Sequence, residues 1–212
     1  MRGILINNTV HTANDLRLVM TGKDLPAPKV QTYAVEVPGR NGLLDLSEFL
    51  TGEPTYSNRT LKFEFLGDGS RETVLSLIDV MLSYHGKNIT VTTDDFTGWY
   101  YTGRADVTYS DKGYYVTFVL TIDAQPFSYS LTPKSYTYTN STEQVVTLFN
   151  AGVSVIPTVT VDTETTIVYG DTTLRLSAGT YEPEALKLKH GNNNLTITST
   201  GEVNITYREA VI

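Results

Sequence analysis

Runs in which apolar and polar residues alternate recur along this chain, whereas helical spacing of apolar residues is found in a single segment. Leu61, Phe63 and Phe65 alternate with Lys62 and Glu64, which is the period of a half-buried β-strand. Thr, Tyr, Val and Asn are plentiful throughout, and these residues favour strands and turns. The pattern therefore predicts a mainly β fold.

The predicted helix covers about residues 71–84, where apolar residues recur at spacings of three, four and seven. Ser70 is suited to cap its first turn, and Gly86 is suited to end it. Residues 88–108 predict a hairpin, and the β-branched and aromatic run 114–122 predicts a central strand. The first part of the chain therefore predicts a β-sandwich-like domain with one α-helix.

The domain boundary is expected near residues 123–132, because the helical pattern is absent beyond it. We therefore expect two domains, 1–128 and 129–212. In the second, short alternating pairs recur about every ten residues, which is typical of a jelly-roll-like β-sandwich. The predicted strands centre on Tyr136/Tyr138, Val145/Thr147, Val159/Val161, Ile167/Tyr169, Leu174/Leu176, Leu186/Leu188, Leu195/Ile197 and Val203/Ile205/Tyr207.

The segment from Arg40 to Tyr56 combines apolar residues with turn residues. It is too broken for a core element and too apolar for a free loop, so we expect an extension that packs on another surface, such as a second copy of the chain. The preceding run, Val30 to Val37, is apolar on both alternating faces and predicts a separate strand that is covered on both sides for part of its length.

Charge and cysteine content exclude several classes of protein. The 212 residues contain 16 basic and 23 acidic side chains, giving a net charge of −7, whereas proteins that hold DNA phosphates are usually basic. Cysteine is absent, which excludes disulfide scaffolds, zinc ribbons and thiol catalysis. The apolar run after Arg2 is too short for a signal peptide, so we expect synthesis in a cytoplasm and no membrane insertion.

No catalytic or metal site is predicted, and no cofactor. Asp94 and Asp95, beside two aromatic residues, could form a carboxylate pair, but adjacent residues of a strand point to opposite faces. The histidines lack the close spacing of metal ligands. They are His11, His85 and His190.

The tyrosines of the second domain leave two interpretations open. Their rings could stack on sugars, which makes a carbohydrate-binding module the alternative function, or they could pack in the core and across strands, which tyrosine also favours. These residues are Tyr129, Tyr136, Tyr138, Tyr169, Tyr181 and Tyr207.

Several strings, in this order, resemble the distal tail proteins (Dit) of long-tailed siphophages. Val37 to Glu48 is similar to the family's PGR-G-LD-S stretch, and Tyr56 to Phe65 is similar to the string that follows. Weaker similarities then cover nearly the whole remaining chain. They are His85-Gly86-Lys87, Asp94-Asp95, Tyr100 to Arg104, the junction Asp123 to Phe127, Asn150-Ala151-Gly152 with Pro157, Gly191 to Asn194, and Gly201 to Tyr207.

The resemblance implies a virion structural protein of a phage or prophage that infects Gram-positive bacteria, assembled in the host cytoplasm. Family members form hexameric rings through the N-terminal domain at the tail tip, between the tail tube and the tail-associated fibre or lysin protein. DNA passes through without specific binding, and receptor-binding proteins are further candidate partners. The C-terminal domain in the family is a galectin-like sandwich.

The resemblance also implies a belt that wraps the neighbouring subunit, and we place this belt at about residues 40–56. Arginines beside turn residues could form ion pairs between subunits or lie on a solvated face. The expected interface residues are Arg40, Leu43, Leu44, Leu46, Phe49, Leu50, Arg59 and Arg104.

Overall fold

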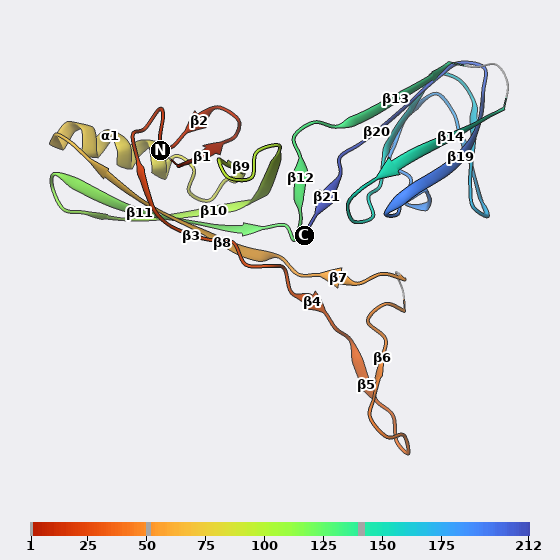
Figure 1. Ribbon diagram of the computed structural model, residues 1–212, viewed down its shortest axis with the longest axis horizontal. Coiled ribbons are helices and arrows are strands. Elements are labelled where there is room, and N and C mark those ends of the chain that lie inside the picture. The colour runs from red at the N-terminus through yellow and green to blue at the C-terminus, as the bar shows by residue number, and fades with distance from the viewer. Residues whose placement is uncertain (1, 50–51, 140–142) are drawn as a thin grey trace. The chain divides into compact units, whose positions relative to one another are not determined.

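The computed structural model describes residues 2–49, 52–139 and 143–212 (Figure 1). The chain divides into two compact units, the first running to Ser128 with Ile212 added, the second being Tyr129–Val211. Antiparallel strands dominate both, and α1 (Arg71–Leu82) is the one α-helix of the described residues, so the predicted mainly β class is confirmed. No helix in the described ranges is long and apolar enough to cross a membrane.

One continuous antiparallel path, β2-β1-β9-β10-β11-β8-β3, forms the main sheet of the first unit. Strands from both ends of the path supply side chains to a single core, which contains Ile4 of β1 and Phe63 of β8. The sandwich-like packing expected for this domain is thus achieved within one sheet. The strands are β1 (Ile4–Ile6), β2 (Val10–His11), β3 (Val19–Asp24), β8 (Arg59–Asp68), β9 (Asn88–Thr93), β10 (Trp99–Asp111) and β11 (Tyr115–Ala124).

The helix α1 lies between β8 and β9 in the chain and contacts β8, β10 and β11. Ser70 is its N-cap, and the hydroxyl of Ser70 accepts a hydrogen bond from the backbone N–H of Thr73 at 3.3 Å. One face of the helix is buried on the sheet, as the predicted spacing requires. The buried residues are Val74, Leu77, Ile78 and Met81.

A two-stranded ribbon, which we call the arm (residues 30–56), is inserted between β3 and β8. It pairs β4 (Val30–Gln31) with β7 (Thr55–Tyr56), and β5 (Ala34–Glu36) with β6 (Leu43–Asp45). Figure 1 shows this ribbon running away from the sheet. The predicted covered strand at 30–37 is therefore wrong: these residues form the outgoing half of the arm, and Val30 and Tyr33 are exposed.

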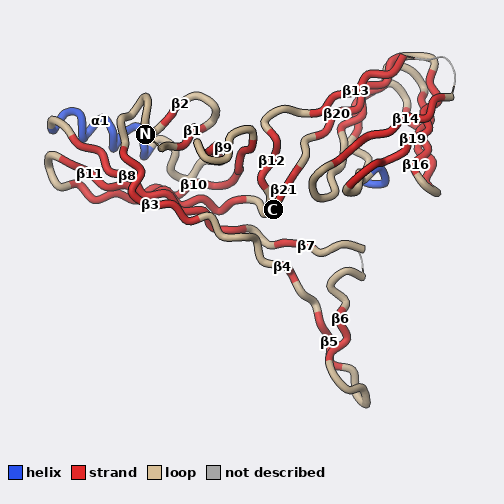
Figure 2. The backbone as a smooth tube through the Cα atoms, in the orientation of Figure 1, coloured by secondary structure: helices blue, strands red, loops and turns tan. Residues whose placement is uncertain are grey.

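The second unit is a β-sandwich, as predicted. Its strands, drawn red in Figure 2, form two sheets with the orders β13-β20-β15-β18 and β14-β19-β16-β17. Residues of both sheets share one core. The strands are β13 (Lys134–Thr139), β14 (Gln144–Asn150), β15 (Thr158–Val161), β16 (Thr165–Tyr169), β17 (Thr172–Leu176), β18 (Gly179–Tyr181), β19 (Gly191–Ser199) and β20 (Glu202–Tyr207), with β21 (Ala210–Val211) pairing β12 (Ser128–Ser130).

The strand predicted around Leu186 and Leu188 is wrong. Residues Glu184–Leu186 form the short 3-10 helix η1, and Leu188 makes only an isolated bridge with Val155. Leu186 and Leu188 are nevertheless both fully buried, so the alternation correctly indicated burial but not strand pairing.

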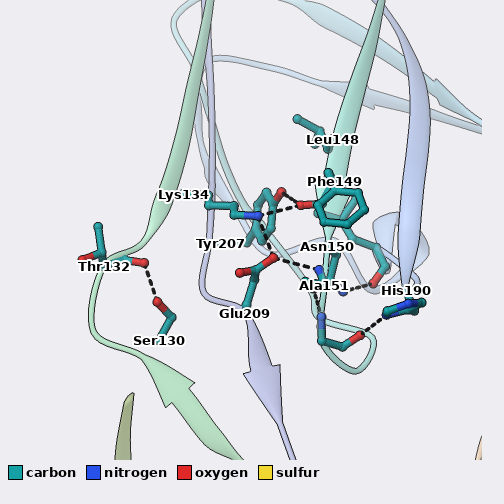
Figure 3. A network of polar contacts seen from close by, with 12 residues as sticks. Ser130, Thr132, Lys134, Leu148, Phe149, Asn150, Ala151, His190, Tyr207 and Glu209 are labelled. Atoms are coloured by element: carbon teal, nitrogen blue, oxygen red, sulfur yellow. Dashed lines mark hydrogen bonds and ion pairs between the residues drawn. The ribbon is translucent and has the colours of Figure 1, made fainter. Parts of the chain in front are cut away.

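A polar network closes one end of this sandwich (Figure 3). The Nζ of Lys134 donates to Glu209 Oε1 at 2.6 Å and to the carbonyl of Phe149 at 3.0 Å, while Tyr207 donates to the same carbonyl at 2.7 Å. Glu209 also accepts from the backbone N–H of Ala151 at 2.8 Å. Burial acts to raise the pKa of Glu209, but the hydrogen bonds from Lys134 and Ala151 outweigh it and hold this pKa below its ordinary value.

We expect the variant Glu209→Gln to be less stable than the wild type by about 2 kcal/mol at pH 7, because it loses a charge-assisted hydrogen bond. Since the folded pKa lies below that of an unfolded glutamate, about 4.3, the stabilisation is present above that pH and is lost as pH falls through the folded pKa. The difference between the two proteins should therefore shrink on acidification.

Chemical denaturation at pH 7 and at pH 3, followed by circular dichroism, measures this difference. The exposed Glu184 offers a matched control, Glu184→Gln, which should unfold like the wild type. A stability difference for Glu209→Gln that stays constant with pH would contradict the role given to the carboxylate.

Candidate assembly surface

The arm presents apolar side chains on both faces. Adjacent residues of a strand point to opposite sides, so Leu43 and Leu44 of β6 face opposite ways. Leu44 lies opposite Val35 of β5 and is half-buried, whereas the side chain of Leu43 is 63% exposed. A ribbon of two strands has no further layer to cover these faces, and isolated ribbons of this kind are marginally stable in water.

Phe49 is the most exposed large apolar residue among the described residues of the arm, at 78%. Its backbone is nevertheless ordered: Phe49 N–H donates to the carbonyl of Leu46 at 3.1 Å, and Gly52 N–H donates to that of Glu48 at 2.7 Å. A second link joins this turn to the outgoing strand, where Tyr33 N–H donates to Ser47 Oγ at 2.7 Å. The turn therefore holds an aromatic ring in solvent, and with the exposed Leu43 it gives the arm more than one uncovered apolar side chain.

The other expected interface residues occupy different environments. Arg40 is exposed at the far end of the arm, and Leu46 is half-buried. Arg104 is exposed on β10, where its Nη1 donates to the carbonyl of Gly86 at 2.7 Å. Leu50 lies outside the described residues. The arm thus collects Arg40, Leu43, Leu44, Leu46 and Phe49, whereas Arg104 belongs to the sheet.

Arg59 does not lie on a solvated face. It is the first residue of β8, at the root of the arm, and its side chain is 8% exposed and turned to the core side of the sheet. Its Nη1 donates to the carbonyl of Pro26 at 3.3 Å, and its guanidinium carbon lies 5.0 Å from the centre of the Tyr101 ring. Burial lowers the pKa of Arg59, with Tyr101 acting in the opposite direction.

Two nitrogens of Arg59, Nε and Nη2, are buried and have no hydrogen-bond partner among the described residues. This placement could have been found from the sequence, because Arg59 has the same parity as Leu61, Phe63 and Phe65. Extending the alternation back by one position predicts an inward side chain. Whether Arg59 belongs to a subunit interface remains a prediction.

The sheet register places Arg59 and Arg104 close together along the sheet, at neighbouring positions across β8, β11 and β10. Arg59 pairs with Ala124, which pairs in turn with Gly103, and Arg104 follows in the next row opposite Asp123. Arg59 points to the core face, whereas Arg104 is exposed on the other face. The two arginines therefore cannot serve one contact directly, although both mark the root of the arm.

Asp94 and Asp95 are occupied by structural contacts. Asp94 accepts from the backbone N–H of Gly3 at 2.7 Å and is 2.9 Å from His11 Nε2, while Asp95 pairs with Lys23. Burial acts to raise the pKa of Asp94, but the hydrogen bonds from His11 and Gly3 outweigh it and lower the pKa. The hydrogen bond from Lys23 is the main cause that lowers the pKa of Asp95.

A general acid at neutral pH requires a raised pKa, so this pair is unsuited to acid catalysis. Within the ranges that the structure describes, no group of three or more His, Asp or Glu side chains could hold a metal ion.

The tyrosines of the second unit mostly line its core. Tyr207 is buried, its ring stacks on that of Tyr136 at 6.2 Å between centroids, and burial raises the pKa of Tyr207. Tyr138, Tyr169 and Tyr181 are partly buried and pack against the same core. These five rings therefore form no open platform for sugar stacking, and core packing explains their positions.

The comparisons with known proteins concern the fold. No family model matches the sequence, and no curated protein matches it. Among solved structures, this chain is similar to the SPP1 Dit protein, with a TM-score of 0.64 at 16% identity over 100% of both chains. The chain has the Dit fold. It is also similar to the phage P2 baseplate in its activated conformation, with a TM-score of 0.51 at 10% identity over 100% of both chains.

The likeness to the SPP1 Dit structure confirms the mainly β, Dit-like fold that the sequence resemblance implied, whereas the galectin-like form of the second domain stays a prediction. The SPP1 protein is described as a paradigm of the hub adsorption apparatus in phages that infect Gram-positive bacteria. Structural similarity at such low sequence identity establishes the fold of this chain, and its role follows from its own surface.

If the arm is a binding surface and not part of the core, its aromatic side chain should add little to the stability of the isolated chain. We expect Phe49→Ser to change the free energy of unfolding by less than about 0.5 kcal/mol, because the ring is mostly in solvent. By contrast, Phe63→Ala in the core should cost about 3–5 kcal/mol.

Denaturation followed by fluorescence of Trp99, the one tryptophan of the chain, measures this difference in the first unit. A loss of stability for Phe49→Ser close to that for Phe63→Ala would contradict the assignment of the arm as an unsupported surface.

Proposed function

We propose that this protein is a virion structural subunit that forms a homohexameric ring at the distal end of a long, non-contractile phage tail. The arm carries the proposal: it is an ordered ribbon with apolar side chains on both faces and nothing in its own unit to cover them. Wrapping around the neighbouring subunit would bury these side chains. Similarity to the Dit fold over the whole chain supports the same role.

In this proposal the first unit forms the ring and the arm is the belt. The ring joins the tail tube to the tail-associated fibre or lysin protein, and receptor-binding proteins are candidate further partners. The protein would be assembled in the cytoplasm of the bacterial host and act at the tail tip of the virion, with no catalytic step.

A closed ring requires that one patch of each subunit meets a different patch on the next. The arm fulfils the first half of this requirement, because it leaves the sheet and exposes a surface that differs from the sheet itself (Figure 1). If the next subunit receives the arm, the same contact repeats around the ring and no arm remains unpaired.

The acidic composition suits a ring that DNA crosses. With a net charge of −7 per chain, the ring would repel the phosphate backbone at short range and would not retain the passing DNA. A ring structure whose lumen is lined by lysine and arginine would contradict this part of the proposal.

The solution mass of the purified protein tests the ring. We expect light scattering after size exclusion to give six times the chain mass of 23.4 kDa, and negative-stain images to show a central hole. Because a ring can need the tail tube as template, a monomer is re-examined with purified tail tubes present. Failure to form rings in both conditions would reject the proposal.

The arm is tested by Phe49→Asp. A charge at the centre of an apolar contact should shift the protein to monomers, while the exposed position leaves the fold of the isolated chain intact. Size exclusion with light scattering measures assembly, and circular dichroism checks the fold. The exposed Thr173 of the second unit provides a control, Thr173→Asp, and equal assembly of both variants would contradict the role of the arm.

A further inference from the structure

The root of the arm contains an uncompensated buried charge. Arg59 is 8% exposed, and its Nε and Nη2 have no partner among the described residues. Its two contacts are a carbonyl at 3.3 Å and the face of an aromatic ring, both electrically neutral. A buried guanidinium with neutral partners only is strongly destabilising, and a carboxylate is the group that its planar N–H fork fits best.

No carboxylate of the same unit fills this place in the described structure. The nearest acid by register, Asp123, sits one row away and is exposed on the other face of the sheet. Asp94 and Asp95 are bonded to His11 and Lys23. The isolated chain therefore leaves open a site for an anionic group from outside.

We infer that Arg59 receives the carboxylate of Glu48 from the arm of a neighbouring copy. This inference rests on the ring proposed above and names the contact by which the arm docks. Each subunit would offer Glu48 to one neighbour and Arg59 to the other, which is the repeating contact that a closed ring requires.

Glu48 is selected among the acids of the arm in two steps: Asp45 and Glu53 already have contacts, and Glu36, whose carboxylate has none with a described residue, has no aromatic ring beside it in the chain. Asp45 accepts hydrogen bonds from the backbone and hydroxyl of Ser47, and Glu53 has an interaction of its own. The carboxylate of Glu48 has no hydrogen bond or ion pair with a described residue. It also adjoins the exposed ring of Phe49, so a charge and an apolar anchor lie side by side in the chain.

The receiving end has matching chemistry. Close to Arg59 in the chain, Tyr56 packs its ring edge-on to that of Phe127, with 5.5 Å between centroids. A buried arginine that packs on the ring of Tyr101, with further rings close in the chain, suits a carboxylate followed by a phenyl group, as in Glu48-Phe49. The carbonyl of Pro26 accepts the hydrogen bond from Arg59 Nη1, and Pro26 lies just before the arm in the chain. A displacement of the arm on docking would therefore break this hydrogen bond and free the guanidinium.

A double-mutant cycle on the full-length protein tests the pairing, with the concentration of half-assembly as the readout. We expect Arg59→Met and Glu48→Gln each to raise this concentration at least about thirtyfold, because each removes one partner of a buried charge pair. The double variant should raise it no further than the single variants, since the interaction is lost only once.

The dilute, monomeric protein gives a second readout. Arg59→Met removes an unpaired buried charge, so the first unit should unfold at an unchanged or higher denaturant concentration. Trp99 fluorescence measures this unfolding midpoint. If Arg59 instead stabilised its own chain, as an internal clamp between the arm and the sheet, the substitution would lower this midpoint. Matched controls are Arg175→Met and Glu36→Gln, both exposed in the isolated chain, which should assemble like the wild type.

The outcomes separate the two proposals. A wild type that forms no ring, with or without tail tubes, rejects the ring and this pairing with it. A wild type that forms rings while Arg59→Met assembles equally well rejects the pairing alone. Independent, multiplying effects of the two substitutions reject Glu48 as the partner, and a lowered monomer midpoint for Arg59→Met identifies an internal clamp instead.

Discussion

A two-stranded ribbon cannot bury its own side chains, and the organisation of the first unit follows from this constraint. In the main sheet, the buried apolar face meets further elements: α1 contacts β8, β10 and β11, and strands from both ends of the sheet contribute to one core. The arm has only its two strands. Its stability in the isolated chain comes from backbone pairing, such as that of Val35 with Leu44, and from the turn around Phe49.

The arm is attached to the rest of the unit through its most deeply embedded strand. β8 pairs with β11 over its whole length, from Arg59 opposite Ala124 to Asp68 opposite Tyr115, and it pairs with β3 on its other side. The returning half of the arm runs directly into this strand. A displacement of the arm would therefore act first on Arg59, where the ribbon ends and the core begins.

Sequence periodicity predicted the parts of the fold that are covered locally. The alternation at Leu61, Phe63 and Phe65 and the helical spacing of α1 both lead to side chains buried in the same unit. The prediction for Val30 to Val37 is wrong because apolar residues on both faces of a strand indicate cover on both sides. Cover from outside the chain leaves the same sequence pattern as cover from within it, and periodicity does not distinguish the two.

The candidate site was predictable in part for a related reason. The broken, apolar stretch from Arg40 to Tyr56 indicated an extension, but its pairing partner across the ribbon had to come from the structure. Arg59 is expected at the surface of the subunit, either in an ion pair between subunits or in solvent, because charged side chains usually lie there. Its parity with Leu61 indicates an inward side chain, and only the structure shows that no acid among the described residues pairs with it. The same holds for Leu186 and Leu188, where the sequence alternation predicts burial correctly but does not predict which backbone groups pair.

The features that make the isolated chain less stable are concentrated in and next to the arm. Arg59, a buried cation with no acidic partner among the described residues, opposes folding of the single subunit, whereas the exposed ring of Phe49 adds little to its stability; both would become favourable once a neighbour covers them. The second unit has no such deficit at its Lys134–Glu209 network, where the charges are paired within the chain. Covering these groups on assembly would therefore add stabilising free energy that the first unit does not have as a monomer. Because the buried charge and the exposed ring require different groups, any partner that covers the arm and its root has to supply a carboxylate together with apolar surface, which a surface that is merely apolar does not offer.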